Sequence, residues 1–557
     1  MQVAQAIAHI LKAEGVRYLF AYPLNPLIEA AAAIGIRPII VRQERSGAHM
    51  ADAISRLSSG EEIGVFVMQH GPGVENSFGA VAQAYGESVP MLFIPAGYNR
   101  NVANYFPNFN AVRNMQHVTK WAEPIGLAAE TPNVMRRAFA QLRNGRPGPV
   151  LVELPWDVAT EEVTSWNPND YVPSFKARSA PDPEQVQAAA KALAKSERPV
   201  IYAGQGVHYA KAWSELKELA ELLNCPVTTS LEGKSAFPET HPLSIGSGGH
   251  ATPKAVYHFL HECDTIFGIG CSFAFTAFGT RMPTGKQVIH ATLDAVDLNK
   301  DVPAQFGLIG DAKLTLRALL DALGKLNLDQ AQARRTRCPA EIKQVKDAWM
   351  AEWLPKLQST QQPMTPYRVI HELNQLVDKQ KVVITHDAGS PRDQLVPFWE
   401  SERPLSYIGW GKTTQLGYGL PLAMGAKLAR PDCLCINVWG DAAIGFTGMD
   451  FETACRERIP ILSILFNNFC MAMELPIMPI STEKYRSTDI QGDYAAMARA
   501  FGGYGERITD PADIVAALQR GIAATEQGTP ALLEFITCKE LEMSLHYSAY
   551  PSKAREE

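Results

Sequence analysis

The sequence predicts an α/β protein built from three parallel-sheet domains, and three observations support this prediction. Short apolar runs of strand length alternate with amphipathic stretches of helix length along almost the whole chain, which is typical of strand–helix–strand units on a parallel sheet. The chain of 557 residues is too long to form one compact core, because a domain usually holds about 100–200 residues. Two polar linkers interrupt the alternation and divide the chain into rough thirds.

These two linkers set the expected domain boundaries. Residues 165–184 are rich in Pro, Asn, Ser and Asp. Residues 334–365 are charged, partly helical in pattern, and end in Gln361-Gln362-Pro363. We therefore expect domains over residues 1–165, 185–333 and 366–545.

Each third contains its own series of strands and helices. The apolar runs expected to form buried strands are residues 18–20, 38–41, 65–68, 91–94 and 150–154 in the first third, 199–204 and 265–270 in the second, and 382–385, 434–438 and 461–466 in the last. Stretches of helical period lie between them, for example from Gly47 to Arg56.

Composition and charge argue against several classes of function. Lys and Arg number 52 and Asp and Glu 58, a net charge of −6, and no Lys/Arg run suggests the basic patch of a nucleic-acid-binding protein. The longest apolar stretches are strand-sized, so we expect no membrane span, and the N-terminus enters an amphipathic pattern without the features of a signal peptide. The nine Cys residues are scattered, mostly in apolar segments, which is typical of reduced thiols in a cytoplasmic protein.

The segment from residue 439 to 468 carries the most informative pattern. A buried strand ends at Gly440-Asp441, Thr447 and Asp450 form a Ser/Thr-x-x-Asp/Glu helix start, and the next strand ends at Asn467-Asn468. We expect that helix to run from this start to about residue 458. Because a right-handed crossover makes the two strands parallel, Asp441 and Asn468 should emerge at the sheet edge where open α/β sheets bind ligands.

One carboxylate and one amide oxygen at that edge suit Mg²⁺, which takes hard oxygen ligands and keeps positions for waters and substrate phosphates. The small residues Ala442 and Ala443 would let backbone N–H groups approach a phosphate at the helix start. The alternative is purely structural: Asp441 caps a helix and Asn467-Asn468 forms a turn.

Gly440-Asp441 followed by Asn467-Asn468 resembles the diphosphate–magnesium motif of thiamine diphosphate (ThDP) enzymes. Over nearly its whole length the chain looks like the branch that contains acetolactate synthases and the pyruvate and benzoylformate decarboxylases. The resemblance implies three doubly wound domains, namely an N-terminal pyrimidine-binding domain, a central Rossmann-like domain and a C-terminal diphosphate-binding domain. It implies ThDP and Mg²⁺ as cofactors.

The same resemblance implies the metal ligands, which are Asp441, the Asn468 side chain and the Cys470 backbone carbonyl. The sequence departs from the family pattern at two positions. Ala442 replaces the last Gly of the usual Gly-Asp-Gly, and Cys470 stands where a Gly is common. A methyl group and a backbone ligand are both tolerable, so we expect altered affinity rather than lost binding.

Further cofactor contacts follow from the resemblance. Leu416 matches the bulky residue that holds ThDP in its bent form, and the Thr414 carbonyl would accept a hydrogen bond from the aminopyrimidine. Ser390, after Asp387-Ala388-Gly389, is the expected diphosphate donor. The full set of expected cofactor contacts is Ser390, Thr414, Leu416, Gly440, Ala442, Ala443, Asn468 and Met473; the Gly-rich segment after Leu416 could equally be a plain loop and Met473 plain core.

Glu44 follows the strand 38–41 and precedes a helix of small residues, and it resembles the family's catalytic Glu. That carboxyl group bonds the pyrimidine ring, so that the cofactor's own nitrogen can remove the thiazolium proton. The role needs a carboxyl group in a dry site, where a hydrogen bond from the neutral acid is strong. In isolation, a Glu at a strand end is more often solvated or part of an ion pair.

Five residues are candidates on the substrate side. His70 resembles the proton-relaying His of benzoylformate decarboxylases but could equally cap the next helix. Glu474 matches a catalytic Glu of pyruvate decarboxylases but could be a surface residue at a helix start. Asn110 replaces a Gln of the synthases, and Leu24-Asn25 replaces two Gly residues, which would narrow the pocket.

We therefore expect an enzyme that cleaves and forms C–C bonds next to a carbonyl of a small-molecule 2-oxo acid or hydroxy ketone, with neither nucleic acid nor membrane as partner. The first expectation is 2-oxo acid decarboxylation with carboligation. The alternatives are a non-decarboxylating lyase for 2-hydroxy ketones or 1,2-diketones, and a catalytically silent cofactor-binding protein. The resemblance implies that the active unit is a homodimer or homotetramer with active sites at the subunit interface. In the central third, we expect Gly204-Gln205-Gly206 to serve packing of the domain.

Overall fold

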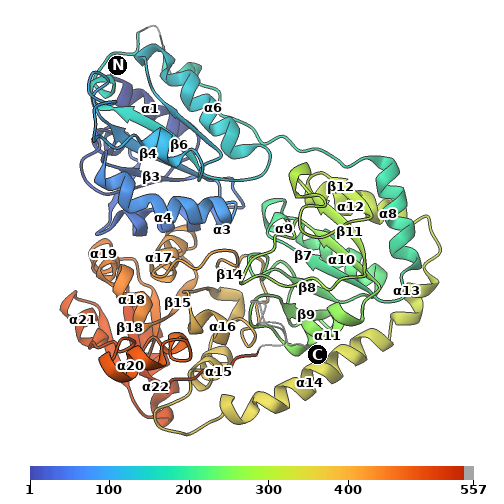
Figure 1. Ribbon diagram of the computed structural model, residues 1–557. Helices are drawn as coiled ribbons and strands as arrows, with labels where there is room; N and C mark the ends of the chain where they lie inside the picture. Colours follow the sequence, from blue (N-terminus) through green and yellow to red (C-terminus); the bar gives the residue numbers. More distant parts are fainter. Residues whose placement is uncertain (165, 545–557) are drawn as a thin grey trace.

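The computed structural model describes residues 1–164 and 166–544, in which the chain forms three six-stranded sheets packed with helices (Figure 1). Neighbouring strands are parallel in all three sheets. The predicted α/β architecture is thereby confirmed. Ser165 and Leu545, two of the expected domain boundaries, lie outside the described residues.

The first domain has the strand order β2-β1-β3-β4-β6-β5. Its strands are β1 Tyr18–Ala21, β2 Arg37–Ile40, β3 Gly64–Met68, β4 Met91–Gly97, β5 Trp121–Pro124 and β6 Val150–Pro155. Its helices are α1 Val3–Ala13, α2 Leu27–Ala33, α3 Glu44–Leu57, α4 Pro72–Gly86, α5 Ala111–Met115, α6 Thr131–Arg143 and α7 Trp156–Ala159. The central strands β3 and β4 are buried throughout, as expected for a sheet with both faces covered.

The central domain has the order β12-β11-β10-β7-β8-β9, which is that of a Rossmann fold. Its strands are β7 Pro199–Ala203, β8 Val227–Thr229, β9 Ser244–Ser247, β10 Thr265–Ile269, β11 Gln287–Thr292 and β12 Phe306–Ile309. Its helices are α8 Pro183–Lys195, α9 Gly206–Tyr209, α10 Trp213–Leu223, α11 Lys254–Glu262, α12 Ala312–Leu323 and α13 Asp329–Arg334, and the long helix α14 Arg337–Leu357 leads to the last domain (Figure 1).

The last domain has the order β14-β13-β15-β16-β18-β17. Its strands are β13 Val382–His386, β14 Tyr407–Ile408, β15 Leu434–Gly440, β16 Leu462–Asn467, β17 Tyr504–Ile508 and β18 Ala531–Ile536. Its helices are α15 Pro366–Leu376, α16 Ser390–Leu395, α17 Gly419–Ala429, α18 Asp441–Thr447, α19 Phe451–Glu457, α20 Pro479–Tyr485, α21 Tyr494–Ala500 and α22 Ile514–Glu526.

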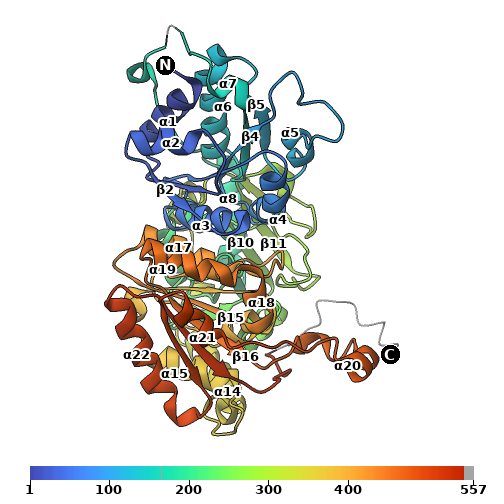
Figure 2. The same ribbon diagram turned by 90° about the vertical axis from the view of Figure 1, so that its left-hand side faces the viewer.

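The first and last domains stack on each other through α3 and α17, and the central domain lies beside both (Figures 1 and 2). One hydrophobic core spans this contact and includes Met50 of α3 and Met424 of α17. The two helices come very close, because a Cβ atom at Gly425 would lie 2.3 Å from the Met50 carbonyl oxygen. This contact fixes the position of α3, and with it Glu44 at its first turn.

The helical segment expected from Thr447 to about residue 458 is present as the 3-10 turn Gly448–Asp450 followed by α19, which ends at Glu457. A separate helix, α18, precedes it and occupies Asp441–Thr447. The Thr447 hydroxyl donates to the Gly417 carbonyl at 2.8 Å instead of capping a helix. The extended backbone of Gly440 (φ −106°, ψ 171°) ends the strand and lets the helix start at once.

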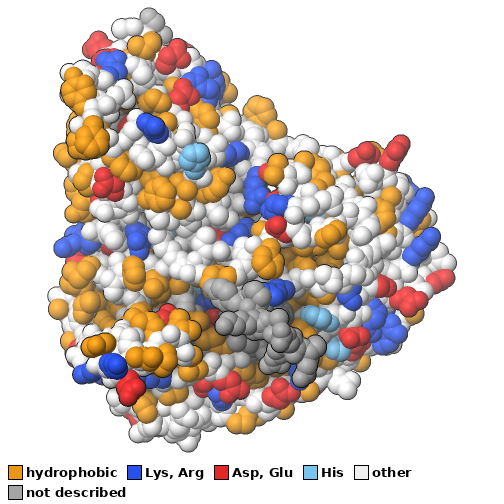
Figure 3. All heavy atoms as spheres, viewed as in Figure 1, with side chains coloured by type: hydrophobic (Ala, Val, Ile, Leu, Met, Phe, Trp, Pro, Cys, Tyr) orange, Lys and Arg blue, Asp and Glu red, His pale blue; other side chains and the backbone are white. Residues whose placement is uncertain are grey.

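On the face of the molecule seen in Figure 3, neither positive nor negative side chains dominate. Lys and Arg side chains are scattered there among acidic and apolar ones. In the described part of the chain, no helix combines the length and the apolar character needed to cross a bilayer.

Candidate active site

The strand order places a crevice in the last sheet between β13 and β15. The strand that follows β13 lies on one side of this pair, and the strand that follows β15 lies on the other, so the strand order reverses between them. In open α/β sheets, ligands bind outside the carboxyl ends of the strands at such a switch point. Asp387 directly follows β13, Asp441 directly follows β15, and Asn468 directly follows β16. Three polar side chains therefore emerge at one edge, as the parallel crossover predicts.

Asp441 and the loop after β16 contact each other directly. One carboxylate oxygen of Asp441, Oδ2, accepts hydrogen bonds from the backbone N–H groups of Asn468 at 3.2 Å and Cys470 at 3.1 Å. Asp441 is buried, and burial raises the pKa of its carboxyl group to about 6. A cation beside this group would offset the cost of burying its charge.

The donor set fits a hard divalent cation. Oδ1 of Asn468 is buried and has no hydrogen-bond partner, which is costly unless something binds it. Cys470 is buried too, and its backbone pairs with Asp489 in an isolated bridge that holds the loop. The described residues contain no group of three or more His, Cys, Asp or Glu side chains placed for a metal ion, so a site here would use one carboxylate with amide and carbonyl oxygens.

The segments expected to hold the diphosphate converge on the same place. Gly389, with φ +82°, precedes Ser390 at the start of α16, and a Cβ atom at Gly389 would lie 3.9 Å from the Met473 sulfur. A Cβ atom at Gly440 would lie 3.5 Å from the Pro391 side chain. The starts of α16 and α18 and the loop carrying Met473 are therefore neighbours, with Ala442 and Ala443 in the first turn of α18.

A buried carboxylate holds the turn after Leu416. Asp387 accepts hydrogen bonds from the backbone N–H groups of Gly417 at 2.9 Å and Gly419 at 2.7 Å, although burial raises the pKa of its carboxyl group to about 6. Leu416 is half-buried, and Thr414 is an exposed residue. The sequence analysis did not predict that Asp387 anchors this turn. Its position between a buried strand and Ala388-Gly389 could have indicated such a role.

Glu44 lies in the first turn of α3 and is only 5% exposed. Burial raises the pKa of its carboxyl group, and the nearby Asp450 acts in the same direction. The Asn76 side-chain amide donates a hydrogen bond to Oε2 of Glu44 at 3.2 Å. The structure thus gives Glu44 the enclosed environment that a neutral carboxyl donor needs.

Glu44 belongs to the contact between the first and last domains. Asp450, the last residue of the 3-10 turn between α18 and α19, accepts a hydrogen bond from the Arg42 backbone N–H at 2.8 Å. Arg45 donates to the Leu416 carbonyl at 3.4 Å. None of the hydrogen bonds or ion pairs in the described residues joins Glu44 to Asp441.

The structure gives three of the candidates on the substrate side different surroundings. His70 precedes α4, but Gly71 is the N-cap residue and no side chain caps this helix, so the capping alternative for His70 is wrong. Asn110 caps α5, because its Oδ1 accepts the Arg113 backbone N–H at 2.8 Å. Glu474 is half-buried in the short 3-10 turn Ala472–Glu474, close in sequence to Met473.

The two residues that replace glycines also have defined places. Leu24 has φ +82°, a conformation that favours Gly, and its side chain is 54% exposed. Asn25 is buried, and its Nδ2 donates to the Met68 and Ile94 carbonyls at 3.0 and 2.9 Å. Asn25 therefore joins the ends of β3 and β4 as part of the framework.

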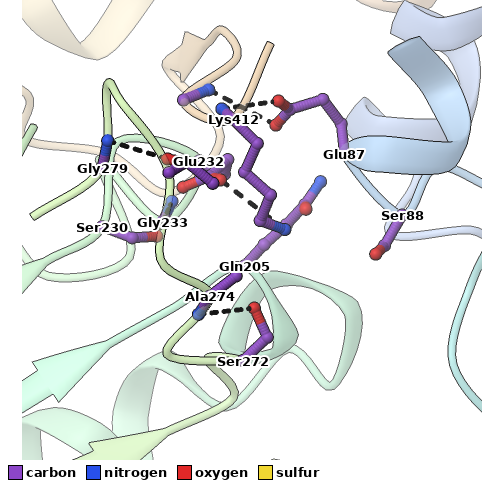
Figure 4. Close-up of polar contacts among 12 residues, drawn as sticks. Glu87, Ser88, Gln205, Ser230, Glu232, Gly233, Ser272, Ala274, Gly279 and Lys412 are labelled. Atoms are coloured by element: carbon purple, nitrogen blue, oxygen red, sulfur yellow. Dashed lines mark hydrogen bonds and ion pairs between the residues drawn. The ribbon is translucent and has the colours of Figure 1, made fainter. Parts of the chain in front are cut away.

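A separate cavity of about 150 Å³ lies where the three domains meet, at the switch point between β7 and β10. Gly204 serves packing as expected, because a Cβ atom there would lie 2.4 Å from the Gly270 carbonyl oxygen. Gln205 nevertheless lines the cavity, together with Glu232 and Lys412 (Figure 4). This cavity was not predicted, since its walls come from all three thirds of the chain.

Comparison with known proteins agrees with this architecture. Residues 1–120 match the family described as "Thiamine pyrophosphate enzyme, N-terminal TPP binding domain", residues 186–319 the "central domain" and residues 387–535 the "C-terminal TPP binding domain" of the same enzymes. The "Probable acetolactate synthase large subunit" of Methanocaldococcus jannaschii is 32% identical over 561 residues, covering 96% of this chain and 92% of that protein. The "Acetolactate synthase isozyme 3 large subunit" of Escherichia coli is 28% identical, covering 93% of this chain and 92% of that protein.

Proposed function

Because the chain belongs to the thiamine pyrophosphate enzyme family, we propose that it uses ThDP to decarboxylate a 2-oxo acid and to join the remaining acyl unit to a second carbonyl compound. The observation that carries this proposal is the convergence of Ser390, Asp441 and Asn468 at one switch point of a chain whose three domains all match that family. The similar proteins named acetolactate synthases favour carboligation as the second half of the reaction.

The last domain would hold the diphosphate end of the cofactor through a bound Mg²⁺. Asp441, the free Oδ1 of Asn468 and the Cys470 carbonyl are the proposed ligands, and they are the hard oxygens that Mg²⁺ prefers. The Ser390 hydroxyl and the first-turn N–H groups of α18, at Ala442 and Ala443, would bind phosphate oxygens. Gly440 and Met473 would line this end of the cofactor.

The first domain would supply the acid that activates the cofactor. When bound, ThDP supplies a carbanion that adds to the substrate carbonyl and accepts the electron pair of the broken C–C bond. Glu44 would keep its proton and donate a hydrogen bond from its carboxyl oxygen to the pyrimidine ring, a role that its burial supports. Leu416 and the Thr414 carbonyl would fix the position of the aminopyrimidine.

Three residues would act on the substrate. His70 and Glu474 would hold or move protons near the reacting carbons. Asn110 would offer its side-chain N–H₂ group, because its side-chain oxygen already caps α5. A cytoplasmic location remains a prediction from the sequence.

We also propose that the active unit is a homodimer or a dimer of dimers. The basis is the likeness to the thiamine pyrophosphate enzyme family, which implies that one cofactor is shared between the first domain of one subunit and the last domain of another. The relatives from M. jannaschii and E. coli are named large subunits.

One assay distinguishes the proposed reaction from its alternatives. The protein loaded with ThDP and Mg²⁺ is incubated with a panel of 2-oxo acids and 2-hydroxy ketones, and CO2, aldehyde and acyloin products are measured. CO2 together with a hydroxy ketone or acetohydroxy acid product is the expected result. Aldehyde without CO2 would establish the lyase alternative, and no product despite normal ThDP binding would establish a catalytically silent protein.

A further inference from the structure

His70 lies in a small cluster of aromatic side chains at the carboxyl edge of the first sheet. Its ring centroid is 4.5 Å from that of Tyr98, with the planes inclined by 63°. The indole nitrogen Nε1 of Trp156 lies 3.3 Å from Nδ1 of His70. Tyr98 directly follows β4 and Trp156 directly follows β6, so two neighbouring strands deliver these rings to one imidazole.

The direction of this hydrogen bond is fixed by chemistry. An indole N–H can only donate, and Nδ1 must therefore offer its lone pair. Neutral His70 then carries its proton on Nε2, which has no hydrogen-bond partner among the described residues and is not one of the buried unpartnered atoms. We infer that Trp156 is a positioning residue, which holds His70 as the Nε2–H tautomer and so presents an N–H donor to the substrate side of the site.

The same contact opposes the charged form of His70. Protonation would place a second N–H at Nδ1, where the indole N–H already points, so one hydrogen bond would be lost. Burial lowers the pKa of His70 in the same direction. Tyr98 is the titratable side chain that faces the ring, and none of the ion pairs in the described residues includes His70.

The cluster is held from outside by a charged pair. The Arg100 side chain donates from Nε to Asp157 Oδ2 at 2.7 Å, and the Arg100 backbone N–H donates to Asp157 Oδ1 at 3.1 Å. Arg100 is two residues after Tyr98, and Asp157 is the residue after Trp156. This pair ties the loop after β4 to α7 and keeps the indole N–H within reach of the imidazole.

The inference rests on the proposed function only for the role of the Nε2–H group in the reaction. The experiment that tests the inference does not measure activity. The holoenzyme is prepared with ring-labelled histidine in an otherwise deuterated chain, and NMR reports the tautomer and the pH titration of His70, whose signals are identified by their loss in His70→Gln. The wild type is expected to show the Nε2–H tautomer and a midpoint below 6.5, the ordinary His value.

Trp156→Phe keeps an aromatic ring but removes the donor. We expect its His70 midpoint to rise by about 0.5–1 pH unit, the value of one hydrogen bond, with both tautomers populated. Tyr98→Phe is the matched control, since it keeps the ring contact, and its His70 should titrate as in the wild type.

Two results would overturn the inference: an Nδ1–H tautomer in the wild type, which does not depend on how any Trp156 variant folds, or an unchanged titration in folded Trp156→Phe. Full turnover by His70→Gln would instead remove the proposed catalytic role of His70, while leaving the assignment of Trp156 intact. The two failures are therefore distinguishable.

Discussion

The side-chain amide of Asn76, an exposed residue, donates a hydrogen bond to the carboxyl group of the buried Glu44 at 3.2 Å. Asn76 lies in α4 and Glu44 starts α3, so two helices of one domain define the orientation of this acid.

Replacing Glu44 by Gln should abolish most of the activity without unfolding the protein. The amide is close in size but cannot supply the acid proton, so we expect a loss of ~10²–10⁴-fold in the rate of CO2 release. ThDP binding, measured by titration of the tryptophan fluorescence, should stay close to that of the wild type. Wild-type turnover by Glu44→Gln would refute the assignment.

Replacing Asp441 by Asn should weaken binding of the cofactor rather than the chemical step. Loss of the carboxylate removes the charged ligand, and we expect Mg²⁺-dependent ThDP binding to weaken by at least ~10-fold. Asp489→Asn is the matched control, because Asp489 is exposed, pairs with Arg486 and lies on the same loop region without contact to Asp441. Equal affinities of the two variants for Mg²⁺ would contradict the metal site.

Replacing Gly425 by Ala should separate the first and last domains. The new methyl group would lie 2.3 Å from the Met50 carbonyl oxygen, so α3 or α17 must shift, at a cost of about 1–3 kcal/mol for overpacking. Gly445→Ala makes the same chemical change in α18 with no atom within 4 Å, and its stability should equal or slightly exceed that of the wild type. The comparison is made by urea denaturation, and equal stability of the two variants would argue against the close helix contact.

Glu87 should make stability depend on pH. It accepts hydrogen bonds from the backbone N–H groups of Lys412 at 2.8 Å and Thr413 at 3.3 Å, and Lys412 lies 3.7 Å from Glu232 (Figure 4). Burial, with the nearby Glu232, raises the pKa of Glu87 from 4.5 to about 7. The folded state therefore binds more protons than the unfolded state between these values, and stability should fall as pH rises from 4.5 to 7.

Glu87→Gln should reduce that slope by about one proton. The measurement is the melting temperature from pH 5 to 8, with Glu75→Gln, an exposed residue of the same helix, as the control that keeps the wild-type slope. An unchanged slope in Glu87→Gln would show that Glu87 does not bind the proton.

The sequence predicted the elements that depend on local pattern. Strands with four or more consecutive apolar residues, such as β3 and β4, stand out because both faces of a parallel strand are buried. The short edge strands β5 and β14 have no such run and were not predicted, nor were β8, β9, β11, β12, β17 and β18. The meeting of Asp441 with the loop at Asn468 could be predicted, because a right-handed crossover leaves few arrangements.

Contacts between distant segments could not be predicted in this way. The hydrogen bond from Lys412 to Glu87 joins residues 325 positions apart, and that from Trp156 to His70 joins residues 86 positions apart. Neither pair leaves a periodic or spacing signal, since each depends on how whole domains or sheet edges are placed. The Thr447 side chain does not cap the helical segment that follows it, because its hydroxyl donates to the Gly417 carbonyl, 30 positions away in the sequence.

The central claim is that Glu44 of one chain and Asp441 of another act on a single ThDP. Mixing Glu44→Gln with Asp441→Asn tests it most directly, at ThDP and Mg²⁺ concentrations that load the wild type but leave Asp441→Asn without cofactor and therefore inactive. Glu44→Gln and Asp441→Asn are unfolded together, refolded and assayed for CO2 release. In a symmetric dimer, random pairing should restore about a quarter of the wild-type activity, because half of the dimers are mixed and one site in each is intact. No activity in a mixture shown to contain the mixed dimer would contradict the claim.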